Sequence, residues 1–512
     1  MHPLVNKILS VDGHRTADST AVANGIRVID LMESAGEAVA KEIILGWSAR
    51  KSVILCGPGN NGGDGFVVAR LLANAGWPVT IALLVEADTY RGDAAEMLTR
   101  WDGPVISMSD VSPSGFNLFV DAIFGAGLSR PLDDEALRLA RDLVEVDVPI
   151  VSIDVPSGVQ GDTGRYKDIA IRADLTVTFH CLKPAHCLQP GRASCGEIVL
   201  ADIGIPGSRR VDQKTVGELN TPALWPQLPG GHSVDTHKHR KGRLCVVSGG
   251  ATSTGAARLA AMSGLRSGAG LVTLLSPPAA IQVNAMNATA IMLKRFEDAE
   301  GLIDALDDRR ATATVIGPGG GVGEDMRQMV VAATSRDGAL ILDADALTSF
   351  EDDPEHLFQH LRLDDVLTPH EGEFARLFPD LMASETNKIE RAQVAAKQAG
   401  CVVVYKGADT VIASPDGRNR VNVHASKALA TAGSGDVLAG MIGAFLAQGK
   451  DSFDAASAAV WLHGEAGIRL GEGLICEDLP EILPAIFSDI ERQRRTLAAR
   501  MALKTSSNGA YK

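Results

Sequence analysis

The chain has 512 residues, of which 45% are hydrophobic, 22% charged and 4% aromatic, and its formal net charge is −14. Such a length exceeds what one hydrophobic core supports, so we expect two or more domains. The acidic balance argues against nucleic acid as a partner, although it permits phosphorylated ligands in local pockets.

The opening residues lack the apolar segment of a secretory signal, and no apolar run reaches membrane-spanning length. Seven cysteines are scattered without a Cys-x-x-Cys pair, which is typical of reduced thiols. We therefore expect a cytoplasmic protein with small-molecule partners, which binds neither a membrane nor nucleic acid.

Alternating strand and helix patterns fill the first block of the chain. The strand candidates are residues 52–56, 79–85, 117–125, 148–158 and 174–179. Continuous apolar strands indicate burial on both faces and hence a mostly parallel sheet. Ligand sites of such sheets lie at the carboxyl ends of the strands.

A glycine-rich loop, GPGNNGGDG at residues 57–65, joins the first of these strands to a helical pattern. Backbone N–H groups in the loop and at the helix start predict an anion site. The loop matches neither the dinucleotide fingerprint nor a Walker loop. A merely tight turn would need one or two glycines, and it leaves Asn60, Asn61 and Asp64 unexplained.

Two further strand ends carry polar residues. Asp121 precedes the loop at residues 125–131, and Asp154 and Ser157 lie in the sequence DVPSG. Each aspartate alone is compatible with a structural role. Because the strand ends of a parallel sheet meet at one edge, we expect these loops to form one functional site with the glycine loop.

The regular spacing of apolar residues is lost between residues 207 and 242, which predicts a domain boundary near residue 220. We assign residues 1–216 and 217–500 to two domains and residues 501–512 to a frayed tail. The second block again alternates strands and helices. Its strand candidates are residues 243–250, 270–277, 313–319, 339–347, 365–370, 401–407 and 410–414.

The sequence Gly433-Ser434-Gly435-Asp436 opens an amphipathic helical pattern in this block. The helix N-terminus would stabilise a transferring phosphoryl group, and Asp436 would accept the proton of an attacking hydroxyl. An aspartate that caps free N–H groups explains the same pattern. Three other strand ends favour the catalytic interpretation of Asp436 over the capping one. They carry the segment 406–410, His370 with two glutamates, and a second glycine loop at residues 315–323.

The first block closely resembles the NAD(P)H-hydrate epimerase domain over roughly 210 residues. The segments GIRVIDLMESAGEAVAKEI, GPGNNGGDGFVVAR and IDVPSG carry the resemblance. It implies a K⁺ ion held by Asn61, Asp121 and Ser157 beside a hydrated nicotinamide dinucleotide, NADHX or NADPHX. We assign substrate contacts to Asn60, Asn61, Gly62, Gly63, Asp64, Gly125, Ala126, Gly127, Leu128, Ser129, Arg130, Pro131 and Asp154.

The reaction implied is loss of the hydroxyl next to the ring nitrogen and return of water from either face, which interconverts R and S forms. Asp154 is our choice for acid or base. The segment FHCLKPAH at residues 179–186 departs from the family pattern, although Lys183 and Pro184 are kept. We interpret His180 and His186 as loop histidines rather than ligands.

The second block closely resembles the NAD(P)H-hydrate dehydratase domain of the ribokinase-like superfamily over about residues 225–490. The resemblance implies that ADP or ATP phosphorylates the hydroxyl, with Asp436 as the base, before phosphate leaves. Mg²⁺ is expected with the nucleotide, without a dedicated cage. The implied nucleotide contacts are Lys406, Gly407, Ala408, Asp409, Thr410 and Gly435. The implied contacts to the hydrated dinucleotide are Ala257, Gly319, His370 and Asp436.

We therefore expect an α/β protein with an N-terminal Rossmann-like parallel-sheet domain followed by a ribokinase-like domain. The main interpretation is a bifunctional repair enzyme that forms a homo-oligomer. One alternative is a small-molecule kinase with an N-terminal dinucleotide-binding domain. Another is a non-enzymatic cofactor-sensing scaffold. Intact Asp436, Asp154, Asn61 and Asp121 argue against the scaffold.

Overall fold

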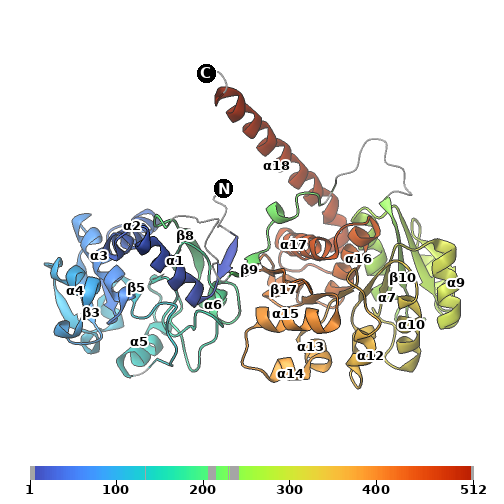
Figure 1. Cartoon of the computed structure of the whole chain (residues 1–512), viewed down its shortest axis with the longest axis horizontal. Coiled ribbons are helices and arrows are strands. Elements are labelled where there is room, and N and C mark those ends of the chain that lie inside the picture. The colour runs from blue at the N-terminus through green and yellow to red at the C-terminus, as the bar shows by residue number, and fades with distance from the viewer. Residues whose placement is uncertain (1–5, 133, 206–214, 229, 231–240, 509–512) are drawn as a thin grey trace. The chain divides into compact units, whose positions relative to one another are not determined.

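The computed structural model describes residues 6–132, 134–205, 215–228, 230 and 241–508 (Figure 1). The chain divides into two compact units, Met1–Leu219 and Asn220–Lys512. The division lies three residues beyond the boundary that we expected between residues 216 and 217. Asn220 belongs to the second unit because its side-chain amide donates to Ser457 O (2.7 Å) and Asn422 Oδ1 (3.1 Å).

The first unit contains a seven-stranded sheet in the order β4-β3-β2-β5-β6-β7-β8, and every neighbouring pair is parallel. The strands are β2 (Ser52–Cys56), β3 (Val79–Leu83), β4 (Val105–Ser107), β5 (Leu118–Ala122), β6 (Ile150–Ile153), β7 (Leu175–Phe179) and β8 (Glu197–Ala201). The five predicted strands and the parallel sheet are confirmed. The sequence did not predict the edge strands β4 and β8, both of which are partly exposed.

Helices cover both faces of this sheet, and each face has its own hydrophobic core (Figure 1). The helices are α1 (Val11–Ala23), α2 (Val28–Gly46), α3 (Asn60–Asn74), α4 (Gly92–Thr99), α5 (Asp134–Val144) and α6 (Gly191–Ser194). A short antiparallel pair, β1 (Lys7–Leu9) with β9 (Thr215–Leu219), completes the unit. The glycine loop packs tightly, because a Cβ at Gly57 would overlap the carbonyl oxygen of Ile123. Close packing therefore accounts for part of its glycine content.

The second unit contains a mixed sheet in the order β18-β17-β16-β15-β14-β13-β10-β11-β12. The strands are β10 (Arg243–Val247), β11 (Leu271–Ser276), β12 (Met292–Arg295), β13 (Ala313–Ile316), β14 (Ala339–Leu342), β15 (Val366–Leu367), β16 (Val402–Tyr405), β17 (Thr410–Ala413) and β18 (Asn419–Asn422). Pairing is parallel from β12 to β16 and antiparallel in β16-β17-β18. All seven predicted strands form, whereas β12 and β18 were not predicted.

The helices of the second unit pack on this sheet, and α7 and α16 belong to its main core. The helices are α7 (Thr254–Arg266), α8 (Ile281–Asn287), α9 (Ala299–Arg309), α10 (Glu324–Thr334), α11 (Asp345–Thr348), α12 (Pro354–Phe358), α13 (Glu371–Leu377), α14 (Pro379–Ala383), α15 (Lys388–Ala399), α16 (Ser434–Ala447), α17 (Ser452–Leu470) and α18 (Asp478–Asn508). None of the helices in the described ranges is long and apolar enough to cross a membrane.

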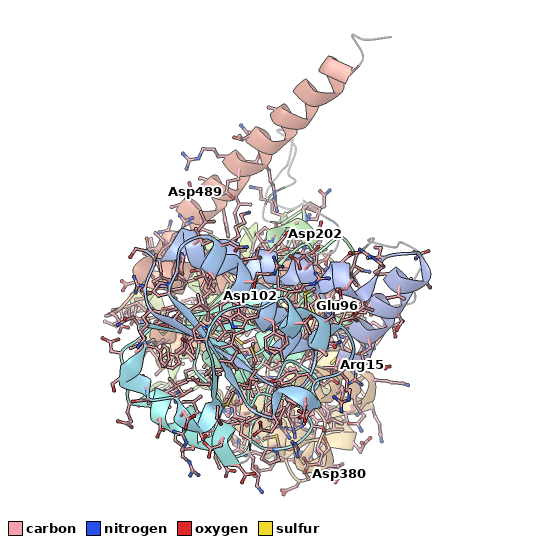
Figure 2. The ribbon with its side chains drawn as sticks, turned by 90° about the vertical axis from the view of Figure 1, so that its left-hand side faces the viewer. Arg15, Glu96, Asp102, Asp202, Asp380 and Asp489 are labelled. Carbon is pink, nitrogen blue, oxygen red and sulfur yellow. The ribbon has the colours of Figure 1, made fainter. Side chains whose placement is uncertain are left out.

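Helix α18 extends away from the sheet at its C-terminal end (Figure 1). Asp489, which Figure 2 labels on this helix, accepts a hydrogen bond from Arg469 of α17 (2.6 Å) and ties the two helices together. The helix continues through residue 508, where we expected a frayed tail from residue 501. The helix therefore takes in most of that segment, and residues 509–512 lie outside the described residues.

Candidate active sites

A cavity of about 830 Å³ lies in the first unit, at the carboxyl ends of β2, β5, β6 and β7. Its lining includes Asn60, Asn61, Asp64, Gly125, Ala126, Gly127, Leu128, Ser129, Arg130 and Asp154, which the sequence predicted. The other predicted contacts Gly62, Gly63 and Pro131 are not in the lining. The three loops thus meet, as expected for a parallel sheet.

Helix α1 supplies a wall of the cavity that the sequence did not predict. His14, Arg15 and Asp18 of α1 line it (Figure 2 labels Arg15). The backbone N–H of Leu9 donates to Leu182 O (2.9 Å), and this bond holds the start of the unit against the loop after β7. The Val11 N–H at the start of α1 also donates to Asp162 Oδ1 (2.7 Å), so residues far apart in the sequence meet at this wall.

Asp154 forms a buried ion pair with Lys183, whose side chain is 5% exposed. Lys183 Nζ donates to Asp154 Oδ1 (2.7 Å), while the Ala126 N–H donates to Oδ2 (3.1 Å). Burial alone would raise the pKa of Asp154, but the Lys183 ammonium holds it well below its usual value. Asp154 is therefore an ionised carboxylate at neutral pH, suited to accept a proton.

His186 forms hydrogen bonds with the backbone of both residues of this ion pair. Its Nδ1 accepts from the Lys183 N–H (3.0 Å), so Nε2 carries the proton and donates to Asp154 O (2.8 Å). Burial and the Lys183 charge lower the pKa of His186 to about 4. Asp154 itself has a left-handed backbone (φ 67°), and this turn aims its side chain toward Lys183 and the Gly125 loop. His186 thus orders the loop, as a loop histidine would.

Asp121 and Ser157 lie beneath the cavity and are fully buried. Asp121 accepts hydrogen bonds from Ser157 Oγ (2.5 Å), Ser157 N (2.8 Å) and Ser152 Oγ (2.9 Å). No lysine or arginine of the described residues forms an ion pair with it. Burial raises the pKa of Asp121, and the hydrogen bonds from Ser157 oppose that rise. A buried carboxylate with hydroxyl neighbours and no cationic partner suits a monovalent cation.

Asn61 and Asp154 approach each other across Gly125. A Cβ added at Gly125 would lie 3.1 Å from Asp154 Oδ2 and 3.2 Å from Asn61 Oδ1. Asn61 is only 9% exposed, and its Nδ2 has no hydrogen-bond partner in the part of the chain that the structure describes. A buried amide donor next to a cavity is a group that a ligand would satisfy.

In the second unit, Asp436 lies in the first turn of α16, which begins after Gly433 in a left-handed conformation (φ 92°). Lys406 Nζ donates to Asp343 Oδ1 (2.7 Å) rather than to Asp436. Burial and the Asp343 charge raise the pKa of Asp436 to about 7, which Lys406 offsets only in part. Such a carboxylate is poised to act as a base near neutral pH.

The remaining groups of this site surround Lys406. A Cβ at Gly435 would lie 3.3 Å from Lys406 Nζ and 3.5 Å from Asp343 Oδ2. Glu373 Oε2 lies 4.0 Å from the same ammonium, and burial raises the pKa of Glu373. The structure thus brings Gly435, Lys406 and Asp436 together, and it adds Asp343, which sequence reasoning missed. The sequence contained a pattern that could have identified Asp343, because this residue directly follows the predicted strand β14, as the other site residues follow their strands.

The segment 406–410 turns between β16 and β17. Thr410 Oγ1 closes the turn on Gly407 O (2.8 Å), and Asp409 Oδ1 accepts from Lys388 Nζ (2.6 Å). Gly407 and Ala408 are exposed, whereas Asp409 and Thr410 are buried. The backbone of Gly407 and Ala408 therefore offers the accessible surface of the predicted nucleotide loop.

The predicted contacts to the dinucleotide differ in accessibility. His370 caps α13, since its Nδ1 accepts from the Gly372 N–H (2.9 Å), and its side chain is 57% exposed. Gly319 is partly exposed and left-handed (φ 65°). Ala257 is fully buried in α7, so it presents no surface to a ligand in this structure.

Among the described residues, no cluster of three or more His, Cys, Asp or Glu side chains could hold a metal ion. This finding covers the carboxylates around Lys406. The histidine-rich segment 232–240 lies outside the described residues.

Two family models match the chain. Residues 28–185 match the YjeF-related protein N-terminus, and residues 244–485 match NAD(P)H-hydrate dehydratase. A bifunctional NAD(P)H-hydrate repair enzyme of Moorella thermoacetica is 35% identical over 504 residues, covering 92% of this chain and 94% of the relative. This chain belongs to the family of bifunctional NAD(P)H-hydrate repair enzymes. A second family member, from Thermofilum pendens, is 32% identical and covers 94% of this chain and 96% of its own.

Solved structures similar to the second unit include an ADP/ATP-dependent NAD(P)H-hydrate dehydratase of Bacillus subtilis co-crystallised with ATP and Mg²⁺. It is 29% identical, covers 51% of this chain and 93% of its own, and has a TM-score of 0.43. The family matches and the sheet topology confirm the predicted α/β fold class, a parallel-sheet domain followed by a second α/β domain that matches the NAD(P)H-hydrate dehydratase model. Helix α1, which lines the cavity of the first unit, precedes the segment that the N-terminal family model matches.

Proposed function

We propose that the first unit interconverts the R and S forms of NADHX and NADPHX, and that the second unit converts the S form to NADH or NADPH with ADP or ATP. The proposal rests on Asp436, a half-buried base with a pKa of about 7 at a helix N-terminus beside Lys406. In the first unit, the Asp154–Lys183 pair in the cavity supports the epimerase half.

In the first unit, the ring nitrogen expels the neighbouring hydroxyl and forms an iminium, and water then adds to either face. The ionised Asp154 takes a proton from the incoming water, with Lys183 fixing its orientation. The other cavity residues would position the dinucleotide, whose diphosphate suits the N–H groups at the start of α3.

The residues present fit a K⁺ ion held by Asn61, Asp121 and Ser157. When bound, the ion would supply positive charge beside the buried Asp121 carboxylate. Ser157 Oγ also contacts the Phe124 N–H (2.9 Å), so a change at Ser157 would reach the loop that carries Gly125. This chain's residues would thus couple the cation to the shape of the cavity wall.

In the second unit, Asp436 accepts the proton of the hydrate hydroxyl as its oxygen attacks the terminal phosphorus of the nucleotide. Phosphate is a better leaving group than hydroxide, so it departs and the adjacent carbon loses a proton. The balance is hydrate plus ADP giving reduced dinucleotide, AMP and phosphate. The described side chains form no Mg²⁺ cage. Any Mg²⁺ would arrive with the nucleotide phosphates.

Lys406 and the exposed backbone of Gly407 and Ala408 would contact the nucleotide, while Gly319 and His370 would contact the dinucleotide. Gly435 and the other N–H groups at the start of α16 would stabilise charge on the phosphoryl group. A homo-oligomer and a cytoplasmic location remain predictions from the sequence.

The test is to incubate the full chain with chirally resolved hydrates of NADH, with and without ADP or ATP. We expect R–S interconversion without nucleotide, and NADH formation only when nucleotide is present. A phosphorylated product without NADH would favour a small-molecule kinase. Absence of both reactions would favour a non-catalytic scaffold and overturn the proposal.

A further inference from the structure

Besides Asp154, two carboxylates that the mechanism above does not use line the cavity of the first unit, Asp18 and Asp64. Asp64 lies in α3 and lines the cavity together with Asp154. Within the described residues, no hydrogen bond or ion pair engages the Asp64 side chain, so no structural role explains it. Asn61, one helical turn earlier, presents a buried amide nitrogen without a partner to the same cavity. Both observations point to a ligand above the start of α3.

Asp64 and Asp154 have opposite environments. Lys183 contacts Asp154 directly (2.7 Å), whereas no lysine or arginine of the described residues forms an ion pair with Asp64. Burial, together with the carboxylates of Asp154 and Asp18, raises the pKa of Asp64 well above its usual value. Two carboxyl groups of one cavity whose pKa values are driven apart are suited to opposite proton-transfer roles. The charged or titratable side chains lining this cavity are His14, Arg15, Asp18, Asp64, Arg130, Asp154, His180 and Lys183.

We propose that Asp64 is the catalytic acid of the epimerase site, which protonates the departing hydroxyl while Asp154 accepts the proton of the incoming water. The inference rests on the proposed epimerase function. The protonated Asp64 gives its proton to the hydroxyl oxygen as the C–O bond breaks, so water leaves and the nitrogen lone pair forms the C=N bond. Water then adds to the carbon, restores the nitrogen lone pair and passes its proton to Asp154. Proton exchange with solvent resets both groups, and the reverse reaction exchanges their roles.

The experiment measures R–S interconversion and incorporation of ¹⁸O from labelled water for the full chain, after subtraction of the enzyme-free rates. Asp64→Asn should reduce both rates by about 10²–10⁴-fold, because an amide does not supply the proton. The dehydration of the S form should be unchanged in the same protein, which shows that the chain is folded. Asp102→Asn, at an exposed position of the first unit outside the cavity lining, is the matched control.

A second measurement does not depend on a variant. The wild-type kcat/KM for epimerisation should fall toward alkaline pH as Asp64 loses its proton, and this limb should be absent in Asp64→Asn. Two results would overturn the role of Asp64 and leave the epimerase function standing. One is an Asp64→Asn protein that epimerises at the wild-type rate, and the other is a wild-type profile without an alkaline limb. A wild type no faster than the enzyme-free reaction would instead overturn the epimerase function.

Discussion

The two sites use the same kinds of side chain and reach opposite electrostatic results. In the first unit, Lys183 contacts Asp154 directly and lowers its pKa. In the second unit, Lys406 contacts Asp343, at the same distance of 2.7 Å, and Asp436 is left with a pKa of about 7. The carboxylate that the lysine contacts, rather than the presence of a lysine, therefore decides which carboxylate is protonated near neutral pH.

The largest effect should come from Asp436→Asn. Dehydration should fall by about 10²–10⁴-fold, since Asn is of similar size but cannot accept the hydroxyl proton. ADP binding should persist, because Lys406 and the helix start are untouched. Calorimetric ADP titration and S-hydrate turnover measure the two quantities.

Epimerisation by the Asp436→Asn protein serves as its internal control and should match the wild type. Asn and Asp are comparable at helix starts. Near-normal dehydration in a folded protein would therefore show that Asp436 is structural and would contradict the kinase-like mechanism.

Lys183→Met should reduce epimerisation by about 10²-fold at neutral pH. Without the ammonium, burial raises the pKa of Asp154, so the base is protonated over a wider range and the acidic limb of kcat/KM moves to higher pH. Lys41→Met, at an exposed position on α2, is the control. An unchanged pH profile would mean that Lys183 does not set the charge of Asp154.

Asp343→Asn should change the pH profile of dehydration more than its maximum rate. Removal of the neighbouring charge frees Lys406 and lowers the pKa of Asp436 below about 7. Because the base must be ionised, activity should then extend to lower pH. An acidic limb that stays in place would show that burial alone raises the pKa of Asp436.

Gly125→Ala should have the smallest effect. The added methyl group would press on Asp154 and Asn61 at 3.1 and 3.2 Å. A small displacement of these two side chains should raise the barrier to epimerisation by about 1 kcal/mol, which is a several-fold loss of rate. Gly46→Ala, which meets no atom within 4 Å, is the matched control. Equal epimerisation by both variants would place the reaction away from Gly125.

The sequence predicted the strands and the meeting of their loops because apolar runs and parallel pairing follow from local patterns. It did not predict which lysine contacts which carboxylate. The Lys183–Asp154 pair depends on the left-handed turn at Asp154 and on His186 behind it. The α1 wall depends on a backbone pairing between Leu9 and Leu182, which no local pattern encodes. Asp343 follows a predicted strand, yet its importance appears only when Lys406 lies beside it.

The opposite charge states of Asp154 and Asp436 near neutral pH are tested most directly by comparing the acidic limbs of the two activities in one wild-type protein. Epimerisation and S-hydrate dehydration, the latter at saturating nucleotide, would be measured from pH 8 downward. We expect dehydration to fall with an apparent pKa near 7, as Asp436 takes up a proton, while epimerisation persists because Asp154 stays ionised. Loss of both activities with the same apparent pKa would contradict this expectation.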